Sequence, residues 1–574
     1  MLIHNTDIAD VFDEIADFLE IGGENPFRIR AYRNAARTVR ELGLELRDMV
    51  TQKDDLTQLP GIGKELAAKI VEILETATAG ALKKLKAKYP QSLRDLLKIP
   101  GLGPKRVRLL YQDLGIDSIS QLIEAAQAGR ISNLSGFGTR TERQILETAE
   151  SFVKKDRRFK IAEVKPHADS LVACLEGVPG VNKVIVAGSY RRAKETVGDL
   201  DILVTACKDS PVLDRFVEYE DVEKVLSKGS TRSSVMLRTG LQVDLRRVEN
   251  DSFGAALQYF TGSQAHNIAI RRIGRQKGLK INEYGVFTFE ERVAGKTEAS
   301  LYKALDLPYI PPELRESRGE IEAARGGRLP KLIELADLNG DLHIHTDYTD
   351  GQNSLKEMAL AARKRGLKYM AVTEHSDRLK AAGGPDPPEL LAQMEEIDRL
   401  NEDFGDFTIL KGIEVEILED GQLDLPDSVL VRMDLVVGTI HNQLNLSLEK
   451  QTRRIERGMD HPHFTFFAHP FGRLINEREP IQVDMIRVIK KARERGCFLE
   501  LNANIRRLDL YDTYCKIARE EGVLIAINSD AHNIAALDHL QYGVGQARRG
   551  WLEKKDVLNT RSLDRLRKLL KQTM

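Results

Sequence analysis

Cysteine is scarce in this chain of 574 residues, and none of its four cysteines belongs to a Cys-x-x-Cys pair. This scarcity excludes a disulfide framework and a zinc ribbon, and it favours a reducing compartment, for which the cytoplasm is the default. Long apolar runs are also missing, so we expect no membrane-spanning helix and no membrane partner. The N-terminus shows no basic stretch followed by an apolar one, which argues against a secretory signal.

An excess of positive charge is absent as well, because 86 lysines and arginines face 87 aspartates and glutamates. A net charge of −1 does not indicate a nucleic-acid-binding protein, so any such affinity must come from local arrangement. Histidine, in contrast, is unevenly spread, since nine of the twelve lie after residue 340. This asymmetry directs the search for a metal site to the C-terminal part.

The chain is too long for a single hydrophobic core, so several domains are expected. Residues 1–80 and 81–150 have helical character, whereas short β-type runs begin near Val184. A stretch rich in Pro, Arg, Glu and Gly over 307–328 predicts a linker. From Leu338 onward, apolar strand-like runs alternate with charged helical stretches, and this alternation predicts an α/β barrel.

Two motifs in the helical part share one pattern: Leu59-Pro-Gly-Ile-Gly-Lys and Ile99-Pro-Gly-Leu-Gly-Pro, with a looser third copy from Leu134. Two glycines around an apolar residue let a tight turn bring backbone N–H groups close to an anion at a helix start. Such contacts hold phosphate without selecting a sequence. One copy is equally well explained as an ordinary turn between helices, but two copies favour DNA binding and resemble helix-hairpin-helix motifs. The glycines expected to contact DNA are Gly61, Gly63, Gly101 and Gly103.

A further pair of motifs carries acidic residues: Gly188-Ser-Tyr-Arg-Arg-Ala is followed by Gly198-Asp-Leu-Asp-Ile-Leu-Val. Side chains alternate along a strand, so Asp199 and Asp201 point to the same side. Two carboxylates so placed can hold the two divalent ions of an in-line phosphoryl displacement, here Mg²⁺ or Mn²⁺. Asp244, in a later apolar run, supplies a third carboxylate. A lone Asp-x-Asp pair is usually a solvated strand end, but the ordered series of motifs predicts nucleotidyl transfer.

The turn at Gly188–Ser189 precedes an expected helix, and its amides together with Arg192 would cradle the oxygens of a triphosphate. The region resembles the nucleotidyltransferase signature of the DNA polymerase beta-like family, and this likeness covers about residues 5–315. The resemblance implies that Asp244 lies nearest the primer 3′-hydroxyl and is a candidate to accept its proton. It also implies that Arg246 can pair with a metal-binding aspartate between turnovers.

The same resemblance implies a thumb with residues for the incoming nucleotide. Tyr259 and Phe260 would lie against the sugar and help exclude ribonucleotides, and the Thr-Gly-Ser that follows brings Gly262 to the nucleotide. Asn267 would contact the edge of the incoming base, and Arg271 would contact the templating side. Nucleotidyltransferases that act on RNA tails or antibiotics would need neither this thumb nor the hairpins.

Some members of the family use a lysine of the first domain to form a Schiff base with an abasic sugar, which requires a lowered lysine pKa. Alignment on the first hairpin places Lys69 at that position, with Arg28 and Tyr32 at helper positions. Glu65 stands where the family usually has a phosphate-binding lysine, and this departure weakens the 5′-phosphate pocket. Lys69 is equally well explained as a lysine on a helix surface, so the lyase stays a hypothesis.

Polar clusters follow the apolar runs of the C-terminal part, at the strand ends where barrel active sites lie. Imidazoles together with carboxylates suit zinc, manganese or iron better than magnesium alone, and nine donors suffice for up to three ions. One buried histidine is more often structural than a ligand, but nine donors in such positions predict a metal site. The nine are His343, His345, Asp350, His375, Glu414, His441, His469, Asp530 and His532.

This cluster resembles the PHP (polymerase and histidinol phosphatase) family over roughly residues 337–574. The resemblance implies a distorted (β/α)₇ barrel with metal-dependent phosphoesterase activity. Glu374 stands where relatives often carry Asp, and Glu416 is expected to support a ligand rather than to bind metal. Three histidines match no ligand position and are expected at the surface: His461, His463 and His539.

The sequence therefore predicts a multidomain fold: N-terminal all-α helix-hairpin-helix domains, an α+β nucleotidyltransferase palm and thumb, and a C-terminal α/β PHP barrel. The predicted boundaries are 1–80 for a lyase-like domain, 81–155 for a fingers-like domain, 156–250 for the palm, 251–315 for the thumb, 316–336 for a linker and 337–574 for the PHP domain. The resemblance implies a bacterial family X DNA polymerase that fills short gaps with dNTPs and trims 3′ ends. We expect a monomer that acts on gapped or primed DNA in base excision repair, in the cytoplasm and at the nucleoid.

Other activities of the C-terminal part stay open. The same metal chemistry would serve an apurinic endonuclease or a 3′-phosphatase. A small-molecule phosphatase of the histidinol-phosphate type and a non-catalytic, metal-stabilised scaffold are the two rival interpretations. Fusion to a DNA-binding polymerase argues against the first, and the intact donor set argues against the second.

Overall fold

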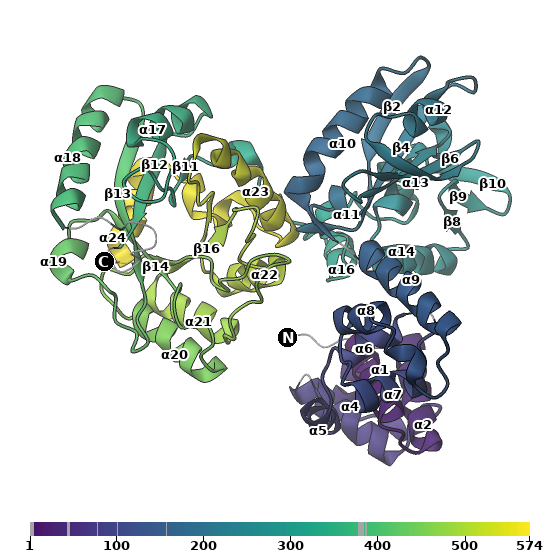
Figure 1. Ribbon diagram of the computed structural model, residues 1–574. Helices are drawn as coiled ribbons and strands as arrows, with labels where there is room; N and C mark the ends of the chain where they lie inside the picture. Colours follow the sequence, from purple (N-terminus) through teal and green to yellow (C-terminus); the bar gives the residue numbers. More distant parts are fainter. Residues whose placement is uncertain are drawn as a thin grey trace. The chain divides into compact units, whose positions relative to one another are not determined.

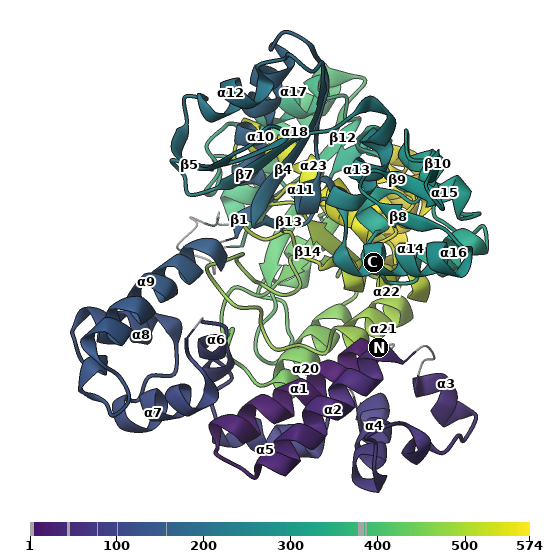
Figure 2. The same ribbon diagram turned by 90° about the vertical axis from the view of Figure 1, so that its right-hand side faces the viewer.

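The computed structural model describes residues 5–42, 46–76, 78–99, 101–156, 158–376, 384 and 387–573; Pro100, in the second hairpin, lies outside the described residues. The chain divides into two compact units, Met1–Arg157 and Arg158–Met574 (Figures 1 and 2). Among the described helices, none combines the length and apolar character that a membrane span requires.

Helices joined by turns make up the first unit, and its described residues contain no strand. One apolar cluster is centred on Phe12 and Ile70, and a second is centred on Leu110 and Ile145. The α-helices are α1 (Asn5–Ile21), α2 (Pro26–Glu41), α3 (Leu46–Thr51), α4 (Lys64–Thr76), α5 (Gly80–Lys88), α6 (Leu93–Leu97), α7 (Pro104–Leu114), α8 (Ile119–Gln127) and α9 (Thr139–Asp156).

The three hairpin motifs form the same turn. The first glycine of each copy has a positive φ, 76° at Gly61, 91° at Gly101 and 84° at Gly136, which a side chain would disfavour. The apolar residue that follows is buried in every copy, and α4, α7 or α9 begins just after the motif. A Cβ built on Gly63 or Gly103 would meet nothing within 4 Å among the described residues. Each turn therefore presents open space at the start of a helix.

The second unit begins with a five-stranded sheet of order β2-β4-β7-β6-β5. β4 and β7 are parallel, and the other neighbouring pairs are antiparallel. The strands are β2 (Val181–Val186), β4 (Asp199–Ala206), β5 (Val222–Lys228), β6 (Arg232–Leu237) and β7 (Gln242–Arg247). Apolar residues of α10 (Ile161–Glu176) and α12 (Val212–Val217) share the core of this sheet.

Helices and a small antiparallel sheet follow, of order β10-β9-β8. The elements are α13 (Phe253–Thr261), α14 (Gln264–Gln276), β8 (Lys280–Asn282), β9 (Gly285–Thr288), β10 (Glu291–Ala294) and α15 (Glu298–Ala304). Residues 316–336, predicted to be a linker, contain helix α16 (Glu320–Arg325). Glu320 and Ile321 of that helix are buried, and Glu320 lies 2.7 Å from Nδ1 of the buried His266. This segment is therefore packed against the preceding helices.

The remaining chain forms seven parallel strands in sequence order, β11 to β17. A parallel bridge between Ile344 and Ala531 joins the two ends of the sheet, which nearly closes it into a barrel. The strands are β11 (Gly340–Asp341), β12 (Tyr369–His375), β13 (Thr408–Glu416), β14 (Leu435–Thr439), β15 (Phe466–Phe467), β16 (Phe498–Asn502) and β17 (Ile525–Asn528). The predicted barrel is confirmed, and with it the overall fold class.

Helices alternate with these strands along the chain and surround the barrel (Figure 1). They are α17 (Leu355–Lys364), α18 (Pro387–Phe404), α19 (Asp427–Leu430), α20 (Leu448–Met459), α21 (Met485–Arg495), α22 (Asp512–Glu521), α23 (Leu540–Arg549) and α24 (Leu563–Thr573). The apolar faces of α17 to α23 pack with the strands in one large core, and those of α24 belong to a second cluster with the opposite side of the strands.

The barrel is joined to the rest of the second unit by apolar and ionic contacts. Ile475 and Leu508 belong to the apolar cluster of the five-stranded sheet, and Trp551 belongs to that of the small sheet. The guanidinium of Arg473 donates to both carboxylate oxygens of Glu195, at 3.1 and 2.6 Å. These buried contacts tie the barrel to both sheets that precede it.

Candidate active sites

Three carboxylates meet on neighbouring strands of the five-stranded sheet. Asp199 and Asp201 lie on β4, and Asp201 is the direct partner of Asp244 in the parallel register with β7. Leu200, between the two β4 aspartates, is fully buried, so the aspartates face away from the core. The structure therefore brings the predicted trio together on one face of the sheet.

The environment of this trio disfavours three bare negative charges. Burial, followed by the charges of Asp199 and Asp244, raises the pKa of Asp201 to about 7. Burial and the charge of Asp244 also raise the pKa of Asp199 above its ordinary value. Like charges so close are tolerated when protons or cations are shared between them. The donor set of three carboxylates fits hard divalent cations such as Mg²⁺ or Mn²⁺.

The predicted triphosphate turn lies directly against these carboxylates. Gly188 begins the short helix α11 (Gly188–Arg191) with φ of 64°, and a Cβ on it would lie 2.8 Å from Oδ2 of Asp201. The neighbouring Ala187 N–H donates to the backbone oxygen of Asp201 at 2.7 Å. Ser189 is half-buried in the same turn. Glycine is therefore required here by both its φ and the close approach.

Arg192 follows this turn and is held by protein groups. Its Nε donates to Oε1 of Glu316 at 2.9 Å, and its Nη1 donates to the backbone oxygen of Thr261 at 2.5 Å. The third nitrogen, Nη2, donates to none of the residues that the structure describes. Glu316 was not recognised from the sequence, because it lies 124 residues away in a predicted linker.

The predicted sugar and base contacts lie together on α13 and α14. The rings of Tyr259 and Phe260 meet edge to face, with centroids 5.0 Å apart. Asn267 is buried and its Nδ2 donates to the Tyr259 backbone oxygen at 2.7 Å, and the Arg271 guanidinium lies 5.9 Å from the Tyr259 ring. Gly262, with φ of 72°, ends α13 after this pair. The structure brings these predicted residues together.

Two arginines near the trio differ in what they contact. Arg246, expected to pair with an aspartate, lies over the Phe260 ring at 4.4 Å, and its Nε is buried without a hydrogen-bond partner among the described residues. Arg232 of β6 instead donates to Oδ2 of Asp244 at 3.0 Å. Arg232 is the partner of Arg246 in the register of β6 with β7. The sequence signal for Arg232 was a cation at the start of the β-type run that precedes the run with the third aspartate.

Lys69, the candidate lyase residue, lies on α4 beside an acid. Its Nζ donates to Oε1 of Glu65 at 2.5 Å and lies 6.0 Å from the Tyr32 ring. Burial opposes the charge on Lys69, but the hydrogen bond and charge of Glu65 together with the interactions of Tyr32 outweigh it and raise the lysine pKa. A Schiff-base nucleophile needs the opposite shift. This arrangement favours the alternative of a helix lysine in an ion pair.

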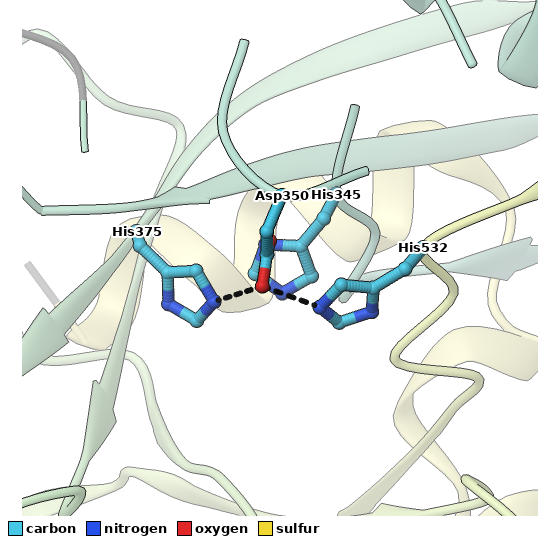
Figure 3. Close-up of side chains that lie close together, drawn as sticks. All are labelled: His345, Asp350, His375 and His532. Carbon is cyan, nitrogen blue, oxygen red and sulfur yellow. Dashed lines mark ion pairs between the residues drawn. The ribbon is translucent and has the colours of Figure 1, made fainter. Parts of the chain in front are cut away.

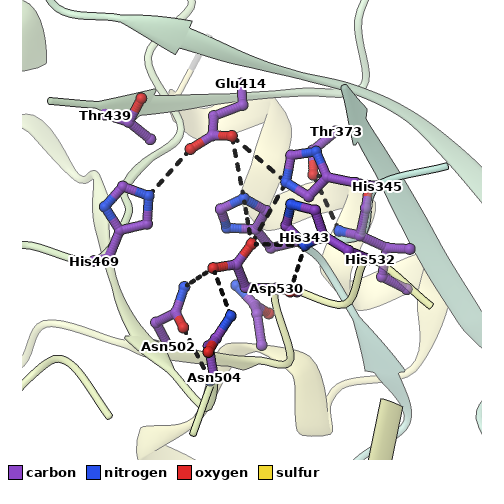
Figure 4. Close-up of polar contacts among 12 residues, drawn as sticks. His343, His345, Thr373, Glu414, Thr439, His469, Asn502, Asn504, Asp530 and His532 are labelled. Atoms are coloured by element: carbon purple, nitrogen blue, oxygen red, sulfur yellow. Dashed lines mark hydrogen bonds and ion pairs between the residues drawn. The ribbon is translucent and has the colours of Figure 1, made fainter. Parts of the chain in front are cut away.

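The nine predicted donors of the barrel gather at the carboxyl ends of its strands. Glu414 of β13 is their centre, because five imidazoles have a nitrogen within 2.7–3.6 Å of its carboxylate oxygens. These are His343, His345, His375, His441 and His469. Figure 4 labels three of them, His343, His345 and His469, beside Glu414. His343 and His345 both follow β11, whereas each of the other three ends or follows a strand of its own.

The remaining donors complete the ring. Oδ2 of Asp350 lies between Nε2 of His375, at 3.6 Å, and Nε2 of His532, at 3.3 Å (Figure 3). Oδ1 of Asp530 lies 3.5 Å from Nε2 of His345. Three groups of donors have all their ligand atoms within 4.8 Å of one another, which is compatible with three cations.

Unpartnered atoms test whether metal cations fit this pocket. Several of the donor atoms are buried and have no hydrogen-bond partner among the described residues: Nε2 of His343, both ring nitrogens of His345, Oε2 of Glu414 and Nδ1 of His469. Leaving a buried polar atom unpartnered costs about 1–3 kcal/mol. Mixed imidazole and carboxylate donors are those that Zn²⁺, Mn²⁺ and Fe²⁺ accept. Metal cations therefore fit the pocket.

The charges within the cluster are strongly coupled. Burial opposes the charge of His375, but Glu414 and Asp350 outweigh it and raise its pKa to about 10. Burial, then the neighbouring His375, lowers the pKa of His345 to about 3. The surrounding imidazoles hold the pKa of the buried Glu414 well below its usual value. Cation binding must therefore displace protons from this pocket.

Buried acceptors orient the donors from behind. Glu500 is fully buried, and its Oε1 lies 2.7 Å from Nδ1 of His343 while its Oε2 accepts from the His469 N–H at 2.8 Å. Oε2 of Glu416 accepts from the backbone N–H of His441 at 2.9 Å and lies 3.2 Å from its ring Nδ1. Such partners fix the ring orientation of metal-binding histidines. The expected supporting role of Glu416 fits this geometry, whereas Glu500 was missed because an acid inside an apolar strand carries no spacing signal.

Glu374 is not part of the donor ring. It is fully buried and accepts hydrogen bonds from Thr346, Thr349 and Gln393. These partners lie on the loop that carries Asp350 and on α18. Glu374 therefore fixes the loop that places Asp350.

Seven of the nine donors, all but His343 and His345, line a cavity of about 700 Å³. Its walls also include Asn504, Arg506, Arg507 and His539, none of them predicted as site residues. Nε of Arg507 lies 3.6 Å from Oδ2 of Asp530. His539, expected at the surface, is instead half-buried in this wall. The Arg-Arg pair just after a predicted strand was a readable signal for a phosphate-binding edge.

Five family models match segments of the chain between residues 3 and 530. The models that match are a helix-hairpin-helix domain (residues 3–79), a SAM-like helix-hairpin-helix tandem (93–151), the DNA polymerase beta palm (158–273), the DNA polymerase beta thumb (256–316) and the PHP domain (341–530). A probable phosphatase of Thermoanaerobacter sp. (strain X514) is 28% identical over 243 residues, which are 40% of this chain and 94% of that protein.

A solved structure of Leishmania infantum polymerase beta, in a ternary P/T complex, matches 39% of this chain and 98% of that chain, at 22% identity and a TM-score of 0.31. The DNA polymerase/3′-5′ exonuclease PolX of Bacillus subtilis (strain 168) is 39% identical over 574 residues, 99% of this chain and 100% of that protein. With helix-hairpin-helix, palm, thumb and PHP matches in the same order, this chain belongs to the PolX family of polymerase beta-like proteins with a C-terminal PHP domain.

Proposed function

We propose that this chain is a template-directed DNA polymerase that fills short gaps, with a separate 3′–5′ exonuclease in its PHP barrel. Its substrates are dNTPs and gapped or primed duplex DNA, and it works as a monomer in base excision repair in the bacterial cytoplasm and at the nucleoid. The observation that carries the proposal is the presence of two carboxylate centres: the aspartate trio on β4 and β7, and the nine-donor ring at the barrel rim.

At the first centre, Asp199, Asp201 and Asp244 would hold two Mg²⁺ or Mn²⁺ ions. Such ions would supply charge stabilisation for an in-line displacement at the nucleotide phosphate. Asp244 would accept the proton of the primer hydroxyl after the ion pair between Arg232 and Asp244 opens. The amides of Gly188 and Ser189 face the triphosphate. Tyr259 and Phe260 lie against the sugar, with Asn267 and Arg271 behind them.

At the second centre, the nine donors would hold up to three Zn²⁺, Mn²⁺ or Fe²⁺ ions. Such ions would supply Lewis-acid chemistry for the hydrolysis of a phosphoester. Arg506 and Arg507 line the cavity beside the donors and bind the phosphate of the terminal nucleotide. Glu500 keeps the His343 ring in the ligating orientation.

Single substitutions test whether the two centres are independent. Asp199→Ala removes one carboxylate of the trio and is expected to lower primer extension at least about 100-fold while 3′ trimming persists. His343→Ala is expected to have the reverse effect. Both activities are measured on one gapped duplex, with and without dNTPs, across Mg²⁺, Mn²⁺ and Zn²⁺. Loss of trimming in Asp199→Ala would contradict the assignment of two centres.

A second activity of the barrel is favoured by its likeness to the probable phosphatase of Thermoanaerobacter, which spans 40% of this chain. On this alternative the barrel hydrolyses a small phosphomonoester, and the same chemistry extends to 3′-phosphatase and apurinic endonuclease activity. Turnover of a small phosphomonoester is compared with release of mononucleotides from primed DNA. Faster phosphomonoester turnover would favour the phosphatase.

Lys69 is the residue of the proposed lyase. Its ion pair with Glu65 and its raised pKa weigh against the activity in the unbound protein. Borohydride trapping on abasic DNA tests it, because a Schiff base at Lys69 is lost in Lys69→Ala. Equal trapping of both proteins rejects Lys69 as the nucleophile.

The proposed domain boundaries remain those of the sequence. They are 1–80 and 81–155 for the two helical domains, 156–250 for the palm, 251–315 for the thumb and 337–574 for the PHP domain. The unit boundary after residue 157 and the PHP match from residue 341 lie close to two of them.

A further inference from the structure

Arg192 is held by a network that extends from the palm into the PHP barrel. Glu316 accepts from Nε of Arg192 at 2.9 Å and, through the same Oε1, from Nη1 of Arg549 at 2.8 Å. Nη1 of Arg549 also donates to the backbone oxygen of Arg192 at 2.9 Å. Arg549 lies at the end of α23. This barrel helix therefore contacts both Glu316, the partner of the Arg192 side chain, and the backbone of Arg192 itself.

The network extends to Asp512 of the barrel and to Arg318, and its Arg549–Glu316 pair is largely buried. Nη2 of Arg549 donates to Oδ2 of Asp512 at 2.7 Å, and Nη1 of Arg318 lies 2.9 Å from the same oxygen. The Arg549 side chain is 3% exposed and that of Glu316 is 12% exposed. A hydrogen-bonded ion pair in such surroundings keeps its geometry better than one on the surface.

The charges in this network leave Arg192 attractive to an anion. Arg192, Arg318 and Arg549 carry three positive charges, and Glu316 and Asp512 carry two negative ones, so the net charge is +1. Burial opposes ionisation of Glu316, but Arg549 and Arg192 outweigh it and lower its pKa to about 2. Because Arg549 offsets the negative charge of Glu316, Glu316 can orient Arg192 while the network keeps a net positive charge.

The orientation leaves one edge of the guanidinium available. Glu316 and the Thr261 backbone oxygen hold Nε and Nη1, whereas Nη2 has no acceptor in the described part of the chain. The backbone also approaches closely, because a Cβ on Gly545 of α23 would lie 3.1 Å from Cβ of Ala193. Helix α23 therefore supports the loop that carries Arg192 by both contact and charge.

We infer that Glu316 and Arg549 are positioning residues of the polymerase site, which hold Arg192 for the triphosphate and make barrel helix α23 a part of nucleotide binding. This inference rests on the proposed polymerase function. It assigns the barrel a second role, separate from its own metal centre, and it predicts that nucleotide affinity depends on a residue of the PHP domain.

Single-nucleotide gap filling by the full chain tests the inference. Glu316→Gln keeps the shape of the side chain but removes its charge, and is expected to raise the KM for dNTP about 10-fold with kcat changed less than about 3-fold, as for loss of one charged hydrogen bond. Arg549→Lys keeps the positive charge, but a lysine cannot hydrogen-bond Glu316, Asp512 and the Arg192 backbone at the same time. A rise in the KM for dNTP that is smaller than that of Glu316→Gln is therefore expected.

A neighbouring arginine provides the matched control. Arg548 lies on the same helix and pairs with Glu313 at 2.7 Å, but it has no contact with Arg192 or Glu316. Arg548→Lys is expected to leave the KM for dNTP unchanged. Trimming of 3′ ends is expected to be the same in all these variants, because their metal centre is intact.

A double-mutant cycle separates positioning from general structural damage. In an Arg192→Ala background, Glu316→Gln is expected to add no further rise in KM, because its effect passes through Arg192. Full additivity would overturn the inference, as would a wild-type KM in both Glu316→Gln and Arg549→Lys. An unchanged KM in Arg192→Ala would also overturn it while leaving gap filling by the wild type intact. Absence of extension by the wild type, in contrast, would refute the proposed function itself.

Discussion

At the scale of single residues, the two centres manage negative charge in different ways. The palm places three carboxylates together, and Arg232 is the cation that pairs with one of them. The barrel instead surrounds Glu414 with imidazoles, which keep it ionised in a buried site. In the palm, most of the negative charge of the three aspartates is left for bound cations to balance. The stability of the metal-free protein should therefore depend on the protonation of these aspartates, and so on pH.

Asp201 allows this to be measured. Its pKa is raised from an ordinary value of 3.8 to about 7, so the folded chain binds its proton more tightly than the unfolded chain does. Stability is therefore lost as pH rises from about 4 to about 7. In metal-free protein, wild type is expected to lose about 1–3 kcal/mol relative to Asp201→Asn between pH 5 and pH 8. Urea unfolding at each pH measures this difference.

The exposed Asp209 provides the control for this experiment, because Asp209→Asn should leave the pH dependence of the wild type unchanged. Addition of Mg²⁺ should restore the stability lost at pH 8, since the cation takes the place of the proton. Parallel curves for wild type and Asp201→Asn would show that Asp201 keeps an ordinary pKa.

The same scale shows where sequence reasoning stops. Asp199, Asp201 and the nine barrel donors could be predicted because each lies in a short motif or at the end of an apolar run. Glu316 and Glu500 could not, because their partners lie far away in the chain and only folding brings them together. Long-range polar contacts have no periodicity to reveal them.

At the scale of elements, strand direction explains the barrel site. Seven parallel strands in sequence order put seven carboxyl ends at one rim, so donors scattered over nearly 200 residues converge. The alternation of strands and helices made this predictable. The packing of α16 in the predicted linker was not, because its Arg, Glu and Gly composition matches a solvated connection as well as a short helix held by the buried hydrogen bond between Glu320 and His266.

The hairpins give an element-scale prediction. Gly63 and Gly103 have open space where a Cβ would go, so alanine fits the folded turn but occupies the place where a phosphate would approach. Gly63→Ala with Gly103→Ala is expected to weaken binding to gapped duplex about 10-fold, since several backbone contacts of about 1 kcal/mol each are lost. Fluorescence anisotropy measures the affinity, and thermal unfolding should be unchanged.

Gly177→Ala, at a helix end in the palm with ordinary contact distances, serves as the control and should bind DNA like the wild type. Gly61→Ala is not a suitable test of DNA contact, because the φ of 76° at Gly61 would strain an alanine whether or not DNA is bound. If the double alanine variant bound as tightly as the wild type, the turns would be simple connections between helices.

At the scale of the whole molecule, the division after residue 157 separates the hairpins from both metal centres. Each unit has apolar clusters of its own, which is what independent folding requires. The barrel, in contrast, shares the core of the palm through Ile475 and Leu508 and is tied to it by Arg473. The polymerase core and the PHP barrel should therefore act as one body, and the helical unit as a separable DNA-holding part.

A chain of residues 158–574 tests this organisation. It is expected to fold, to trim a short single-stranded 3′ end at a rate within about 2-fold of the full chain, and to fill gaps with a Kd for gapped duplex raised about 10-fold or more, because the phosphate contacts of the hairpins are gone. The KM for dNTP at saturating DNA should be unchanged, since α23 and Glu316 are retained. Loss of trimming together with gap filling would mean that the helical unit stabilises the metal centres. In that case the clusters around Phe12 and Leu110 would matter beyond DNA binding, and the two units could not be treated as separable.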